Sequence, residues 1–135
     1  MKWIAALVTS GLVFGLLDFL WLGTIGRPLY QERMGEWLAP KPNMTAALLF
    51  YAIYIVGVSY FVIVPALEAG SLGKSAFSGF LFGLVAYATW DLTNLAVLKD
   101  FPSSIVPIDM AWGTIATMVT SIVTFVIVRA LPFVE

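Results

Sequence analysis

Four long runs of apolar residues dominate the chain, and few polar positions interrupt them. They cover approximately residues 3–25, 43–66, 76–98 and 105–131. A helix needs about 20 mostly apolar residues to cross the hydrocarbon core of a bilayer, and each run has that length. The runs do not alternate between apolar and polar residues, as membrane-spanning strands do. The pattern predicts an all-α membrane protein with four transmembrane helices in a single domain, residues 1–135.

The connections between the four runs are short. They comprise about residues 26–42, 67–75 and 99–104. Short connections favour antiparallel neighbours, so we expect a four-helix antiparallel bundle with an up-down-up-down topology. Both ends of the chain then lie on the same side of the membrane.

The first connection has a helical pattern of its own. Its apolar residues recur with helical spacing at Tyr30, Met34, Trp37 and Leu38. Pro28 suits the first turn of a helix, and Pro40 and Pro42 end it. We predict a short interfacial helix that lies on the membrane surface in this first loop. A simple turn with an aromatic anchor is the alternative.

The composition strengthens the membrane assignment and excludes several kinds of chemistry. Charged residues make up 11% of the chain and hydrophobic residues 61%, whereas a soluble domain carries roughly a quarter charged residues. The chain contains no Cys and no His, which excludes disulfides, thiolate nucleophiles, haem-binding His and Ser-His-Asp triads. A metal site would need oxygen ligands only and would suit magnesium or calcium. We predict no metal site, no cofactor and no nucleic-acid partner.

Three acidic residues lie inside the predicted spans, namely Asp18, Asp91 and Asp109. A charged Asp at the centre of a membrane helix costs about 2.5–3.5 kcal/mol, so such residues face the bundle interior, pair with another group or bind a proton. Counted at about 1.5 Å per residue from one membrane face, their depths are about 10, 10 and 6 Å. We therefore expect the three carboxyls to form one layer.

Aromatic and polar residues accompany these acids at helical spacing. Residues three or four positions apart share a helix face, which joins Trp21 to Asp18, Trp112 to Asp109, and both Tyr87 and Asn94 to Asp91. The candidate ligand- or cation-binding residues are Asp18, Trp21, Tyr51, Tyr87, Trp90, Asp91, Thr93, Asn94, Asp109 and Trp112. They predict an aromatic-walled pocket with a carboxylate rim, covered by the interfacial helix with Arg27 and Arg33. The alternative is that the aromatic residues anchor the protein at the interface and the Asp side chains hold the bundle together.

Two spans carry glycines spaced four residues apart, Gly11 with Gly15 and Gly79 with Gly83. This spacing lets helix backbones approach each other closely. We expect both pairs to form helix–helix contacts inside the bundle. A homo-oligomer that packs through one of these faces is the alternative.

The chain also resembles a known family at two motifs, Trp90-Asp91-Leu92-Thr93-Asn94 and Asp109-Met110-Ala111-Trp112-Gly113. It is similar to small bacterial membrane proteins that are classified as a domain of unknown function and that carry W-D-L-T-N and D-x-x-W-G segments. The similarity extends over the whole chain. The resemblance implies an integral protein of about four spans in the bacterial inner membrane. It implies no activity.

Three functions fit these observations. The first is the binding or transport of a small molecule or cation, because carboxylates between aromatic walls suit a cation or an amine. The second is a membrane-embedded lipid-modifying enzyme or its subunit, with carboxyls as acid and base. The third is a structural accessory subunit of a membrane complex. We expect membrane lipid and a small cationic or lipid ligand as partners, and whether the protein is an enzyme stays open.

Overall fold

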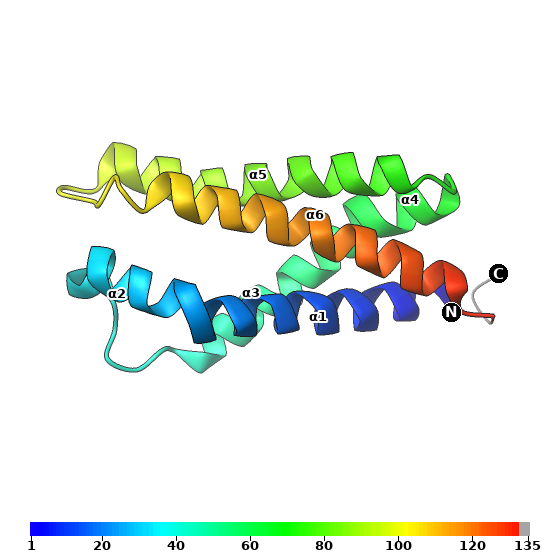
Figure 1. Cartoon of the computed structure of the whole chain (residues 1–135), viewed down its shortest axis with the longest axis horizontal. Coiled ribbons are helices and arrows are strands. Elements are labelled where there is room, and N and C mark those ends of the chain that lie inside the picture. Colours follow the sequence, from blue (N-terminus) through cyan, green and yellow to red (C-terminus); the bar gives the residue numbers. More distant parts are fainter. Residues whose placement is uncertain (133–135) are drawn as a thin grey trace.

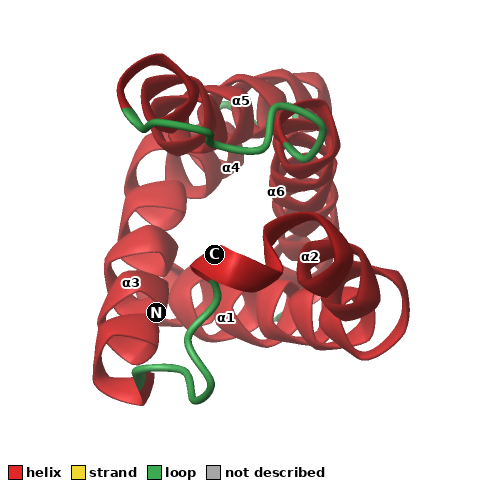
Figure 2. Ribbon diagram, turned by 90° about the vertical axis from the view of Figure 1, so that its left-hand side faces the viewer, coloured by secondary structure: helices red, strands yellow, loops and turns green. Residues whose placement is uncertain are grey.

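Helices make up nearly all of the structure, a computed structural model that describes residues 1–132. The elements are α1 (Lys2–Trp21), α2 (Arg27–Met34), α3 (Met44–Val58), α4 (Val64–Glu68), α5 (Leu72–Val97) and α6 (Val106–Ala130). They form four long apolar rods (Figures 1 and 2), and no strand occurs within residues 1–132. α1 begins at the end of the bundle where α6 finishes (Figure 1). These findings confirm the predicted all-α, four-span membrane fold.

Two of the rods contain a π-helical turn just before a proline. Leu22–Gly26 joins α1 to α2 ahead of Pro28, and Ser59–Ile63 joins α3 to α4 ahead of Pro65. Proline cannot donate to the carbonyl four residues earlier, and its ring crowds that carbonyl. A widened turn relieves this conflict without ending the helix. The first two rods therefore run continuously over Lys2–Trp37 and Met44–Glu68.

This continuity corrects the expectation of a separate interfacial helix. The segment is helical, but α2 prolongs α1 along the same direction (Figure 1). Pro28 does not start a separate helix, because the π-helical turn ahead of it accommodates the proline within one rod. Met34 is buried against Phe101 and Ile105, so α2 packs on the α5–α6 connection. The rod ends with the 3₁₀ turn at 35–37, ahead of Pro40.

Side-chain caps fix two of the other helix starts. Asn43 accepts a hydrogen bond from the Ala46 amide at 3.0 Å, and Ser71 accepts one from the Lys74 amide at 3.1 Å. Such caps satisfy backbone N–H groups that the first helical turn leaves unpaired. Because of the Ser71 cap, α5 begins four residues before the hydropathy pattern predicts.

The closest helix pair is α5 with α6, and its seam is built on Gly79 and Gly83. A Cβ atom at Gly79 would come within 2.6 Å of the Ser121 hydroxyl, and one at Gly83 within 2.7 Å of the Gly113 carbonyl. Gly79 and Gly83 thus form the expected helix–helix contact within the bundle. Gly15 forms no such contact, because a Cβ there would meet no atom within 4 Å, and a Cβ at Gly11 would approach only Ile55, at 3.9 Å.

The distribution of polarity is inverted relative to a soluble bundle. Large apolar side chains cover the outside, including Leu12, Leu16, Phe19, Ile53, Phe77 and Val97. Buried polar side chains lie within, namely Ser10, Ser59, Ser75, Asp91, Thr114, Thr117, Thr120, Ser121 and Thr124. An apolar exterior of this extent requires lipid contact. The structure is that of a multi-pass membrane protein.

Candidate functional site

Asp109 is the centre of a hydrogen-bonded aromatic cluster at the α2 end of the bundle. It lies in the first turn of α6 and accepts a hydrogen bond from the Tyr30 hydroxyl of α2. The Trp21 indole N–H donates to the same hydroxyl at 3.3 Å. Trp21 also stacks on Trp112, with 4.5 Å between ring centroids and 6° between planes. The cluster joins the first rod to α6 and holds the Asp109 carboxylate in place.

Tyr30 is the member of this cluster that is not among the candidate residues predicted from the sequence. In an uninterrupted α-helix the nine residues from Trp21 to Tyr30 advance by about 900°, which places the two on opposite faces. The π-helical turn between them contains an extra residue per turn and rotates Tyr30 toward the face of Trp21. The available signal was Pro28, because a proline within a long apolar helix favours such a turn.

Gly26, in this turn, gives Trp21 its position. A Cβ atom at Gly26 would overlap the Trp21 indole. We expect Gly26→Ala to unstack Trp21 from Trp112 and to shift the tryptophan fluorescence and near-ultraviolet circular dichroism. Gly23→Ala is the matched control, because it lies in the same turn and its Cβ would meet nothing within 4 Å. Unchanged spectra in Gly26→Ala would contradict the stacked geometry.

Asp91 is the most unusual of the three acids. It is fully buried on α5, and neither carboxylate oxygen has a hydrogen-bond partner within residues 1–132. The Asp109 carboxyl lies close enough to interact with it electrostatically. A buried carboxylate without a partner is energetically costly. The arrangement therefore concentrates negative charge that an added cation or proton would neutralise.

The neighbours of Asp91 divide between the interior and the outside. Tyr87 lies within electrostatic range of Asp18 and Asp109, and its ring occupies the space that the missing side chain of Gly113 leaves. Asn94 is half-buried. Thr93 is exposed and bonds to carbonyls of its own helix, so it does not face the cluster.

Two pockets share Asp109 and Trp90. The smaller has a volume of about 230 Å³ and is lined by Phe50, Ala86, Tyr87, Trp90 and Asp109. The larger has a volume of about 420 Å³ and is lined by Tyr30, Met34, Trp37, Leu38, Trp90, Asn94, Leu98, Phe101 and Asp109. Neither lining includes a Lys or Arg. The exposed Arg27 and Arg33, expected above the pocket, line neither of them.

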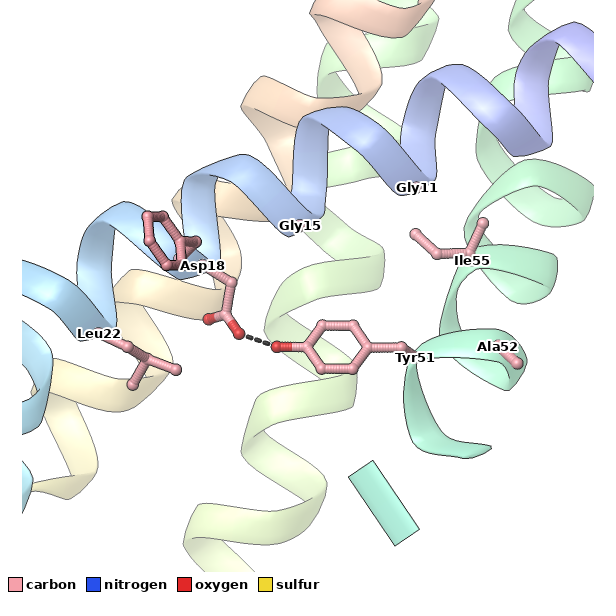
Figure 3. A pocket seen from close by; sticks show the side chains of 8 residues that line it. Gly11, Gly15, Asp18, Leu22, Tyr51, Ala52 and Ile55 are labelled. Carbon is pink, nitrogen blue, oxygen red and sulfur yellow. Dashed lines mark hydrogen bonds between the residues drawn. The ribbon is translucent and has the colours of Figure 1, made fainter. Parts of the chain in front are cut away.

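Asp18 lies in different surroundings from the other two acids. Its Oδ2 accepts a hydrogen bond from the Tyr51 hydroxyl, which reaches across from α3 (Figure 3). Both residues border a groove between α1 and α3, whereas Asp109 borders the two pockets that it shares with Trp90. Within residues 1–132 no three acids come close enough to hold a metal ion. Asp18 thus bonds to Tyr51 at the groove and Asp109 bonds to Tyr30 beside the two pockets, while the carboxyls of Asp18 and Asp109 stay within electrostatic range of each other.

The two sequence motifs meet in this part of the fold. The W-D-L-T-N segment supplies the pocket wall Trp90, the buried Asp91 and Asn94. The D-x-x-W-G segment supplies Asp109, the stacked Trp112 and Gly113. The Trp112 indole N–H is buried without a hydrogen-bond partner in residues 1–132.

Comparisons with known proteins identify a family and no activity. No curated protein and no solved structure matches the chain. The family model described as "predicted membrane protein (DUF2177)" matches residues 3–126. The match extends into all four rods and includes both motifs, so the chain belongs to this family of predicted membrane proteins.

Proposed function

We propose that the protein binds a small organic cation in the pocket beside Asp109, as a binding protein or as the binding step of a transporter. The observation that carries the proposal is the lining of the smaller pocket. It combines one carboxylate, Asp109, with the aromatic rings of Phe50, Tyr87 and Trp90. Aromatic faces and a carboxylate recognise ammonium groups through cation–π attraction and charge.

The electrostatics of the surroundings favour the same kind of ligand. Asp91 adds a second carboxyl near Asp109, and no basic side chain lines either pocket. Negative charge without a basic partner inside a membrane attracts cations and repels anions. An anionic ligand therefore finds no favourable partner here.

The geometry also indicates the size of the ligand. The smaller pocket has about 230 Å³, and the adjoining pocket with about 420 Å³ shares Asp109 and Trp90 with it. Sites for small molecules typically have about 300–1,000 Å³. A compact ammonium fits the smaller pocket, and a substituent of the ligand has room in the larger one.

Choline tests this proposal as a probe, with its uncharged isostere, in which carbon replaces the nitrogen, as comparison. We expect the protein in a nonionic detergent to bind choline more tightly than the isostere in titration calorimetry. Asp109→Asn is expected to weaken choline binding by about tenfold or more, which corresponds to about 1.4 kcal/mol. Trp90→Ala is expected to weaken it by a smaller factor, because it removes one cation–π contact.

Asp100→Asn is the matched control. Asp100 is exposed in the α5–α6 connection and lines neither pocket. Its φ of 57° is a conformation that Asn tolerates well. Equal affinity for choline and its isostere, or equal loss in Asp100→Asn and Asp109→Asn, would refute the proposal.

A further inference from the structure

A second site lies apart from the Asp109 pocket, in a groove between α1 and α3 that opens on the outside of the bundle. Its volume is about 550 Å³. The lining consists of Gly11, Gly15, Asp18, Phe19, Leu22, Tyr51, Ala52 and Ile55 (Figure 3). From Asp18 to Gly11 the helix rises by about 10 Å, which leaves room for an extended segment of a hydrocarbon chain.

The groove exists because small residues face it from both helices. A Cβ at Gly15 would meet no atom within 4 Å, and one at Gly11 would approach only Ile55, at 3.9 Å. Ala52 supplies a short side chain from α3 (Figure 3). The exposed side chain of Phe19, at its margin, belongs to the lipid-facing surface. Hydrocarbon therefore reaches the groove laterally, from the bilayer.

The groove is almost entirely apolar, and its one carboxylate comes from Asp18. Asp18 is the only charged residue in the lining, and Tyr51 donates a hydrogen bond to its Oδ2 (Figure 3). A carboxylate has room for further hydrogen bonds besides the one from Tyr51 and can act as an acceptor for a ligand. The acceptor and the negative charge favour a head group that donates hydrogen bonds and carries a positive charge.

We propose that this groove binds a single-chain amphiphilic amine, with its ammonium group on Asp18 and its hydrocarbon chain along Gly15 and Gly11. Charge complementarity selects the amine head over a neutral or anionic one. The open space at the two glycines accommodates one chain against the α1 backbone. The site shares no lining residue with the Asp109 pocket, so this proposal stands independently of the proposed function.

Photolabelling of the full chain in phosphatidylcholine nanodiscs tests the proposal. The probe is a long-chain alkylamine with a photoreactive diazirine on its chain, compared with the alcohol and the sulfate of the same chain. We expect the amine to label peptides that contain residues 11–22 or 51–55 about tenfold more than the alcohol does, the ratio given by roughly 1.4 kcal/mol. The sulfate is expected to label them least.

Variants separate a specific site from ordinary lipid contact. Gly15→Leu is expected to abolish labelling in the groove, whereas Gly23→Leu, the same change at a position with equally open space, retains it. Ala52→Phe fills the groove from the α3 side and is also expected to abolish labelling. This second variant tests the site if Gly15→Leu does not fold. Asp18→Asn is expected to equalise the amine and the alcohol, and Asp100→Asn, an exposed change outside the groove, to leave the labelling unchanged.

The outcomes distinguish the two proposals. Equal labelling by all three head groups, or amine preference that survives Asp18→Asn, shows annular lipid only and overturns the groove site. Loss of choline binding in Asp109→Asn with no amine preference in the groove supports the proposed function alone. Amine labelling that depends on Asp18, without choline binding, supports the groove site alone.

Discussion

Gly83→Ala is expected to destabilise the protein by about 1–3 kcal/mol, the range for a methyl group forced into a packed interior. An added Cβ would lie 2.7 Å from the Gly113 carbonyl oxygen and 2.8 Å from the Thr117 side chain. The carbonyl belongs to the α6 backbone and cannot rotate away. α5 and α6 must therefore separate, although alanine favours a helix more than glycine does.

The free energy of unfolding in mixed micelles of SDS and a mild detergent measures this effect. Gly15→Ala is the matched control, because Gly15 belongs to the same kind of glycine pair and has no neighbour to displace. It is expected to be neutral or slightly stabilising. Equal destabilisation by the two substitutions would show that the close α5–α6 contact is not what makes Gly83 necessary.

The two glycine pairs show what helical spacing predicts and what it leaves open. Gly79 and Gly83 pack closely because α6 presents Gly113, Thr117 and Ser121 to them. Gly11 and Gly15 have the same spacing but no such partner, and they border a groove instead. A motif on one helix cannot reveal which face of another helix lies against it.

The spans themselves followed from hydropathy, because about 20 apolar residues are needed to cross a bilayer. The helix ends did not, since hydropathy reports the thickness of the apolar layer and not the length of the helix. α5 begins at Leu72 through the Ser71 cap, before the apolar run. The first rod continues through Pro28 to Trp37 because a π-helical turn absorbs the proline.

For the candidate site, the sequence predicts how deep a residue lies along its helix, but not which way the residue faces around the helix axis. Depth is a count of residues along each helix, and the sequence brought Asp91 and Asp109 to one level. Rotation about the helix axis depends on π-helical turns and on packing, so the sequence could not show that Asp18 bonds to Tyr51 and borders a groove of its own. The same rotation placed Tyr30, from outside the predicted first span, on Asp109.

Asp91→Val is expected to raise stability and to weaken cation binding at once. The substitution removes a fully buried carboxyl whose two oxygens lack hydrogen-bond partners in residues 1–132, and it removes the repulsion from Asp109. Replacing such a group by an apolar one of similar size stabilises proteins by about 1–3 kcal/mol. Asp91→Ala serves as a second variant in case the branched side chain does not fit.

The expected loss of affinity follows from the lost charge. The Asp91 carboxyl interacts electrostatically with Asp109 and adds to the attraction that the pocket exerts on a cation. Choline binding is therefore expected to weaken about tenfold in Asp91→Val, which corresponds to about 1.4 kcal/mol. A gain in stability together with a loss of binding is typical of functional-site residues that destabilise the folded protein.

Ser75→Ala provides the control for buried polarity on the same helix. Ser75 is also fully buried on α5, but its hydroxyl donates to the Ser121 carbonyl at 2.9 Å. Removing this satisfied group is expected to cost about 1 kcal/mol and to leave choline binding unchanged. If Asp91→Val and Asp91→Ala destabilise the protein as Ser75→Ala does, Asp91 holds the bundle together. If the Asp91 variants are more stable but bind choline as tightly as the unchanged protein, Asp91 is not part of the cation site. A carboxyl that serves the site through its charge must lower stability and strengthen choline binding, so its removal must change both.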